Sequence, residues 1–159
     1  MMLSQKIAAA AEALGAGAPA SSTIAVEDGS LQLLIDLSQA GPVGMAVREI
    51  QLHNAGSHWS IADLSARSER IAAKVTYLME PLRLVETDSE ALEVELRSVC
   101  PTKRMDRSSF YQARLKGDGR FSLKRVSFNE GDRQRVPVDM QLTSETLERL
   151  ADDLADSLR

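Results

Sequence analysis

The fold of this chain is decided by residues 23–37, which read TIAVEDGSLQLLIDL. Apolar and polar residues alternate on both sides of Asp28-Gly29, a dipeptide that readily supplies the two positive φ angles of a type I′ turn. A two-residue loop at this position predicts the cross-strand pairs Glu27–Ser30, Val26–Leu31 and Ile24–Leu33. The stretch is therefore predicted to form an antiparallel hairpin with one apolar face, which also carries Ile35 and Leu37.

The residues on either side of this hairpin predict two helices and a third strand. Apolar residues recur at helical spacing over residues 1–14, and the glycines and proline that follow make 15–22 a linker. A third strand is expected near Met45–His53. Ser60 then has the position of an N-cap, and a helix with a buried apolar stripe is expected to run from there to Pro81.

The second half of the chain predicts more hairpins and a last helix. In one of these hairpins, Leu82 and Leu84 should face Leu92, Val94 and Leu96 on the core side. The second spans residues 110–128, and its Gly117-Asp118-Gly119 loop should pair Leu115 with Phe121 and Ala113 with Leu123. A short strand over Arg133–Met140, at a sheet edge because of Pro137, and a final helix capped by Thr143 complete the chain.

The predicted fold class is α+β, with the order α-β-β-β-α-β-β-β-β-(β)-α and a mainly antiparallel sheet with helices packed on one face. We expect a single domain over 1–159, made of the helix 1–14, the linker 15–22, a β-β-β-α unit over 23–80 and a β-rich unit with a helix over 82–158. Similar hairpins in the two units leave an internal duplication open, with independent selection of the same local structures as the alternative.

Composition restricts the function classes only loosely. The chain has 159 residues, 43% of them hydrophobic, and its 19 bases and 23 acids give a net charge of −4, which is typical of a folded, soluble domain. No apolar run approaches the roughly 18 residues that cross a bilayer. We expect a cytoplasmic protein; the alternative is a signal peptide over residues 1–20, although Glu12 interrupts its apolar segment.

Few residues offer chemistry for catalysis. His53 and His58, the only histidines, and Cys100, the only cysteine, are the candidates for an enzyme site, although their spacing matches no common metal or nucleophile pattern. The acid pairs Glu93/Glu95 and Asp152/Asp153 are expected on solvent faces. We therefore expect no catalytic residue, no metal and no cofactor.

The charge distribution is the most informative functional feature. Residues 101–136 contain ten bases and only four acids. Alternation along the hairpin 110–128 puts four of these bases on the face opposite Leu115 and Phe121, namely Arg114, Lys116, Arg120 and Lys124. They are the candidate binding residues, for phosphates or for an acidic protein surface. The alternative is that they neutralise acidic parts of the same fold, or of a second copy in a dimer.

Single-strand nucleic acids would also need aromatic residues on this basic face for stacking. Alternation places Phe110 and Phe128 on that face, and it places Tyr111 and Phe121 on the core side.

The helix–three strands–helix order of the first hundred residues or so, the size and the acidic balance together resemble the small chaperones of type III secretion. The likeness is one of element order and includes no shared motif. It implies a dimer that binds an extended segment of a client protein.

Three functional hypotheses follow. The first is a non-enzymatic protein-binding or adaptor domain, as a homodimer. The second is an RNA or single-stranded nucleic-acid binder that uses the hairpin 110–128. The third is an enzyme that uses His53, His58 or Cys100.

Overall fold

The structure is a computed structural model that describes residues 3–14, 22–41, 44–99 and 101–159. Within these residues it contains three helices, which are α1 (Leu3–Leu14), α2 (Ile61–Lys74) and α3 (Ser144–Leu158). The first strands are β1 (Ser22–Asp28), β2 (Leu31–Ala40), β3 (Gly44–Asn54), β4 (Leu82–Asp88) and β5 (Glu93–Ser98). The others are β6 (Thr102–Arg104), β7 (Arg107–Lys116), β8 (Arg120–Asn129), β9 (Arg135–Val138) and β10 (Met140–Thr143).

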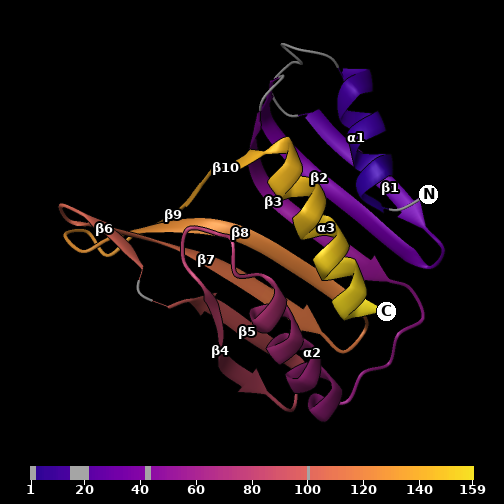
Figure 1. The fold of residues 1–159 in the computed structure, drawn as a ribbon. Coiled ribbons are helices and arrows are strands. Elements are labelled where there is room, and N and C mark those ends of the chain that lie inside the picture. The colour runs from indigo at the N-terminus through magenta and orange to yellow at the C-terminus, as the bar shows by residue number, and fades with distance from the viewer. Residues whose placement is uncertain (1–2, 15–21, 42–43, 100) are drawn as a thin grey trace.

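The strands form one open, antiparallel sheet, so the predicted α+β class is confirmed. The order across the sheet is β1-β2-β3-β8-β7-β5-β4, and the short strands β10, β6 and β9 pair with β3, β7 and β8 (Figure 1). The chain thus makes two meanders of neighbouring strands. They join where β3 pairs with β8, from Glu49 opposite Lys124 to His53 opposite Arg120.

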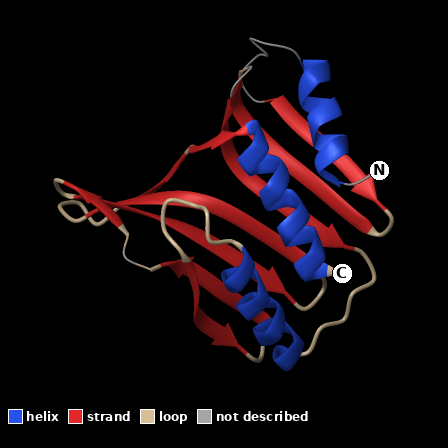
Figure 2. Cartoon of the chain, viewed as in Figure 1, coloured by secondary structure: helices blue, strands red, loops and turns tan. Residues whose placement is uncertain are grey.

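All three helices lie on the same face of the sheet (Figure 2), as predicted. Helix α1 packs on β1 and α3, and α3 packs on β3 and β10 near the junction of the meanders. Helix α2 packs on β4 and β5, although the sequence division into 23–80 and 82–158 groups it with the strands before it. The helices and the inner strand faces bury a continuous core of mostly aliphatic side chains, in which Ile24 and Leu33 are each 1% exposed.

The first hairpin forms with the predicted apolar face but in a different register. The turn residues are Gly29 and Ser30 rather than Asp28 and Gly29, so Val26 pairs with Leu33 and Ile24 with Ile35. Gly29 has a φ of 64°, while Ser30 is not among the residues with positive φ, as in a type II′ turn with glycine at its first position. The predicted pairs were therefore wrong by two residues, and the apolar face is unchanged because strand side chains repeat every two residues.

The other local signals at turns and helix starts are confirmed. In the second hairpin Leu115 pairs with Phe121, and Gly119 has a φ of 91°. At the start of α2, the Ser60 hydroxyl accepts from the Asp63 amide while the Asp63 carboxylate accepts from the Ser60 amide. Thr143 caps α3 by accepting from the amide of Thr146. These features depend only on residues within a few positions of each other, which explains why they could be predicted.

Helix α2 ends at Lys74, well before the predicted end at Pro81. Val75 and Leu78 are buried, as the apolar stripe requires, but they lie in an irregular segment after the end of the helix. Within this segment the Tyr77 hydroxyl donates to Asp153 of α3, 2.7 Å away. Contacts with distant parts of the chain thus replace the last turns of the predicted helix.

Two further predictions for the second half need correction. Leu92 does not face the core: it lies in the β4–β5 connection at a φ of 51° and is 41% exposed, because the Asp88 carboxylate accepts from the amides of Glu90 and Ala91 and forms a longer turn. The single strand predicted over Arg133–Met140 is split into β9 and β10. Pro137 lies on β9, which pairs only with β8 within the described residues.

Candidate binding face

The face of the sheet opposite the helices is the candidate functional surface. None of the described helices covers it (Figure 2). Its central part, on β3, β8 and β7, has a hollow of about 470 Å³. The residues that line this hollow are Glu49, Gln51, Leu52, Gln112, Arg114, Lys116, Arg120, Phe121, Ser122 and Lys124. All four candidate binding residues are therefore in one place, together with β3 residues that the sequence did not single out.

The four basic residues differ in how far the fold already neutralises them. The Arg114 Nε donates to Glu95 Oε1 at 3.1 Å and is 3.9 Å from Glu93, and the Arg120 Nε is 3.5 Å from Asp118. Lys116 and Lys124 have no ion pair within 4 Å among the described residues. The charges of the two arginines are thus partly compensated by neighbouring acids, whereas the two lysine ammonium groups have no acidic partner among the described residues.

Glu95 is buried, which contradicts the prediction of a solvent-exposed acid. It is 5% exposed, although it lies on the face that no helix covers. Gln112 Nε2 donates to its Oε1 at 2.9 Å, and Arg97 Nε is 2.6 Å from its Oε2. Long side chains of neighbouring strand positions enclose it, and the cross-strand register of Glu95 with Arg114 was the signal that could have indicated this.

The surroundings of Glu95 keep it ionised. Burial by itself would raise the pKa of this carboxyl, but the hydrogen bonds from Gln112 and Arg114 and the charge of Arg97 outweigh burial and hold the pKa below its ordinary value. Glu95 is therefore a fixed negative charge that contacts two guanidinium groups, of which that of Arg114 lines the hollow.

The histidines do not form a site with each other or with a carboxylate in the described part of the chain. His53 is half-buried on β3, opposite Arg120, and His58 is exposed in the loop before α2. No hydrogen bond or ion pair joins either one to an acid within the described residues. Cys100 is outside the described residues. Among the residues that are described, no group of three or more His, Cys, Asp or Glu could hold a metal ion.

The aromatic side chains of the β7–β8 hairpin are mostly withdrawn from solvent. Tyr111 and Phe121 are in the core, as alternation predicts. Phe110 is only 9% exposed, and Arg135 lies 5.9 Å from the centre of its ring. Phe128, near the end of β8, is half-buried. None of these four side chains is exposed, so they do not offer an open stacking surface.

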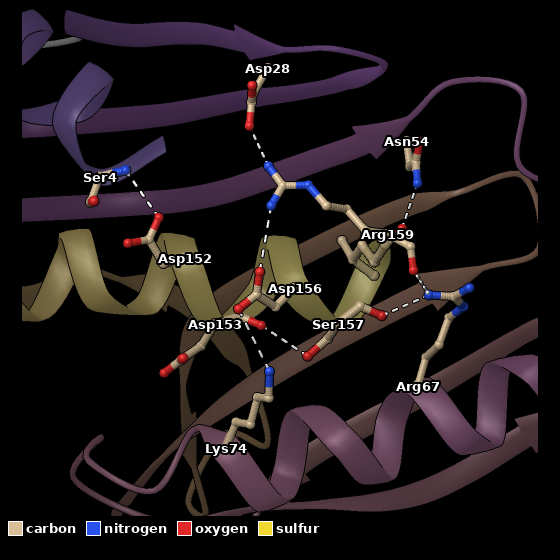
Figure 3. Close-up of polar contacts among 11 residues, drawn as sticks. Ser4, Asp28, Asn54, Arg67, Lys74, Asp152, Asp153, Asp156, Ser157 and Arg159 are labelled. Atoms are coloured by element: carbon tan, nitrogen blue, oxygen red, sulfur yellow. Dashed lines mark hydrogen bonds and ion pairs between the residues drawn. The ribbon is translucent and has the colours of Figure 1, made fainter. Parts of the chain in front are cut away.

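A second hollow, of about 690 Å³, lies where the first hairpin meets the end of α3. Its polar groups bond to one another and connect the strands to the end of α3 (Figure 3). Arg159 pairs with Asp28 and Asp156, and Asn54 donates to the backbone carbonyl of Leu158. Asp28 also contacts Lys6. The charged residues of this hollow thus have partners within the fold, including Asp152, which accepts from the Ser4 amide.

The chain was compared with protein-family models, with curated proteins and with solved structures, and none of them matches it. In the described part of the chain, no helix is long and apolar enough to span a membrane.

Proposed function

We propose that this chain is a non-enzymatic binding module that holds an acidic segment of a partner protein on the face of its sheet opposite the helices. One observation supports this above all: Arg114, Lys116, Arg120 and Lys124 line a single hollow, and the two lysines have no ion pair among the described residues. Among the described residues that line the hollow, four are basic and only Glu49 is acidic, although the chain is acidic overall.

The shape of this surface suits an extended polypeptide. The hollow crosses three neighbouring strands, so successive carboxylates of an acidic segment can each approach a different base. Complementary charge accelerates association and selects the partner. In a recessed site, dissolved salt screens this attraction less than it does on a flat surface. A client segment held in this way is also what the resemblance to secretion chaperones implies.

A protein partner fits this face better than RNA or single-stranded DNA. Stacking by exposed aromatic rings supports single-strand binding, and Phe110, Tyr111 and Phe121 are buried. Nucleic-acid binding is therefore the competing outcome of the test.

The test measures binding of a fluorescent oligoglutamate peptide by anisotropy as salt is raised. The wild-type chain should bind it, and Lys116→Glu with Lys124→Glu should abolish binding, because both unpaired bases become acids. The control is Arg104→Glu with Arg107→Glu on β6 and β7, exposed residues without an ion pair in the described structure, which changes net charge equally. The control should bind like the wild type.

Three results would overturn the proposal. The wild type could fail to bind the peptide at low salt, or the two double variants could lose affinity equally, which would indicate an effect of net charge alone. A single-stranded oligonucleotide of equal length could bind more tightly than the peptide, with the same dependence on Lys116 and Lys124. That result would assign the face to nucleic acid.

A further inference from the structure

Arg114 is held by one edge of its guanidinium group and leaves the other edge open. Its Nε is the atom that donates to Glu95, and the same atom is nearest to Glu93. No described residue accepts a hydrogen bond from its two Nη atoms. The side chain is 52% exposed and belongs to the lining of the basic hollow. A guanidinium group fixed in this way retains two parallel donors, the arrangement that binds an oxyanion in a bidentate manner.

The group that holds Arg114 is itself firmly placed. Glu95 is 5% exposed, and it accepts from Gln112 and contacts Arg97 as well as Arg114. These contacts come from the same strand and from the neighbouring strand β7, so the carboxylate has little freedom to turn. Buried partners of this kind orient the groups that touch a ligand and reduce the entropy lost on binding.

We infer that Arg114 is the specificity-determining residue of the face: its two Nη atoms bind one carboxylate of the partner's acidic segment, and Glu95 is the positioning residue that aims them. The inference rests on the proposed function, because it concerns the same hollow. Lys116 and Lys124 then supply unspecific attraction as point charges, while Arg114 recognises the planar shape of the carboxylate.

Substitution of Glu95 tests the inference, because a positioning role and a purely electrostatic role predict opposite changes in binding affinity. Glu95→Gln removes a negative charge near the hollow, so charge alone would tighten the binding of an anion. If Glu95 positions Arg114, the same change weakens binding. Glu49→Gln is the matched control: Glu49 itself lines the hollow, is half-buried and has no ion pair among the described residues, so its neutralisation should tighten binding.

The experiment measures the affinity of the oligoglutamate peptide for four folded proteins, with thermal unfolding as the check on folding. Against the wild type, Glu95→Gln should weaken binding by about tenfold, the size of effect that the loss of an orienting partner has at metal sites. Arg114→Lys, an exposed and charge-conserving change, should also weaken it by about tenfold. Glu49→Gln should tighten it by about two- to fivefold.

The outcomes separate this inference from the function on which it rests. If the wild type does not bind the peptide, the proposed function fails. If the wild type binds, but Arg114→Lys binds equally well or Glu95→Gln binds more tightly, only the inference fails. If Glu95→Gln does not fold, Arg114→Lys decides alone. A comparison with phosphoserine peptides completes the design, since tighter binding of phosphate than of carboxylate would overturn the assignment of the ligand group.

Discussion

At the scale of single residues, the most consequential pair outside the binding face is Glu80 with Arg125. The two are 4% and 6% exposed, and the guanidinium donates from both Nη atoms to the two carboxylate oxygens at 3.0 Å. Arg125 also lies over the ring of Tyr111, 4.4 Å from its centre, and the Thr102 hydroxyl donates to Glu80. This pair fixes the segment after α2 to β8, where the sequence predicted more helix.

Arg125→Met should lower the free energy of unfolding by about 3–5 kcal/mol at neutral pH, because it leaves the Glu80 carboxylate buried without its partner. Combined with Glu80→Leu, the loss should largely disappear, since no unpaired charge remains. Urea denaturation of the two variants and the wild type measures both effects. A loss below about 1 kcal/mol for Arg125→Met, as for an exposed ion pair, would contradict this interpretation.

The penalty of Arg125→Met should also depend on pH, in a direction that follows from the pKa of Glu80. In the wild type, burial raises this pKa, but the hydrogen bonds from Arg125 and Thr102 and the charge of Arg125 hold it below its ordinary value of 4.5. The pair therefore stabilises the fold above that value, and the contribution is lost as pH falls through the lowered pKa. In the variant, the unpaired acid is neutralised on acidification. The difference between the two proteins should accordingly shrink as pH falls, first above 4.5, where the buried, unpaired acid of the variant takes up a proton, and then through the lowered pKa of the wild type.

At the scale of elements, the β1–β2 and β7–β8 turns each contain a glycine with positive φ, but the surroundings of the two glycines differ. Gly29 and Gly119 have φ angles of 64° and 91°, which side chains other than glycine adopt at a cost. A Cβ at Gly29 would meet nothing within 4 Å, whereas a Cβ at Gly119 would lie 2.3 Å from the backbone oxygen of Asn54. The Asn54 amide donates to the carbonyl of Gly119, so this turn is also the place where the end of β3 attaches to the second hairpin.

Gly29→Ala should therefore cost about 1–2 kcal/mol, the strain of the left-handed backbone alone. Gly119→Ala should cost about 3 kcal/mol or more, because the clash with the Asn54 backbone is added to the same strain. Thermal or urea unfolding of the two single variants provides the comparison. Equal losses at the two positions would mean that the contact between β3 and the turn does not restrict Gly119.

At the scale of the whole molecule, the two meanders are held together at β3–β8 and by the end of α3, which lies above that junction. Arg67 of α2 donates to the backbone carbonyls of Ser157 and Arg159, both at 2.9 Å (Figure 3). Its guanidinium group also stacks on Trp59, 4.2 Å from the centre of the ring. Asn54 at the end of β3 donates to the carbonyl of Leu158. Carbonyls in the last turn of a helix have no partner within the helix, and here side chains of α2 and β3 supply one.

Arg67→Ala should loosen the last turn of α3, because it removes two charged hydrogen bonds at once. The expected loss is about 1.5–3 kcal/mol of unfolding free energy, with faster amide hydrogen exchange over residues 154–158. Arg70→Ala, an exposed arginine on the same helix for which the described structure shows no bond, is the matched control and should change neither quantity. Equal behaviour of the two variants would show that Arg67 does not hold α3.

The amino-acid sequence by itself determined the features that depend on near neighbours. Alternation placed Ile24 and Leu33 in the core and the four bases of the second hairpin on one face, and local caps and glycines indicated where helices begin and chains turn. These features follow from the period of a strand and from hydrogen bonds across a few residues, so no distant partner is needed.

Only the tertiary structure decided the rest, because it depends on residues far apart in the chain. The early end of α2 coincides with contacts of Tyr77 and Glu80 to α3 and β8, and the burial of Glu95 depends on the side chains of β7 beside it. The basic hollow also depends on β3, which adds Glu49 and Gln51 next to bases that come much later in the sequence. Pairing of distant strands fixes which charges meet and which stay unpaired, and local pattern carries no information about that pairing.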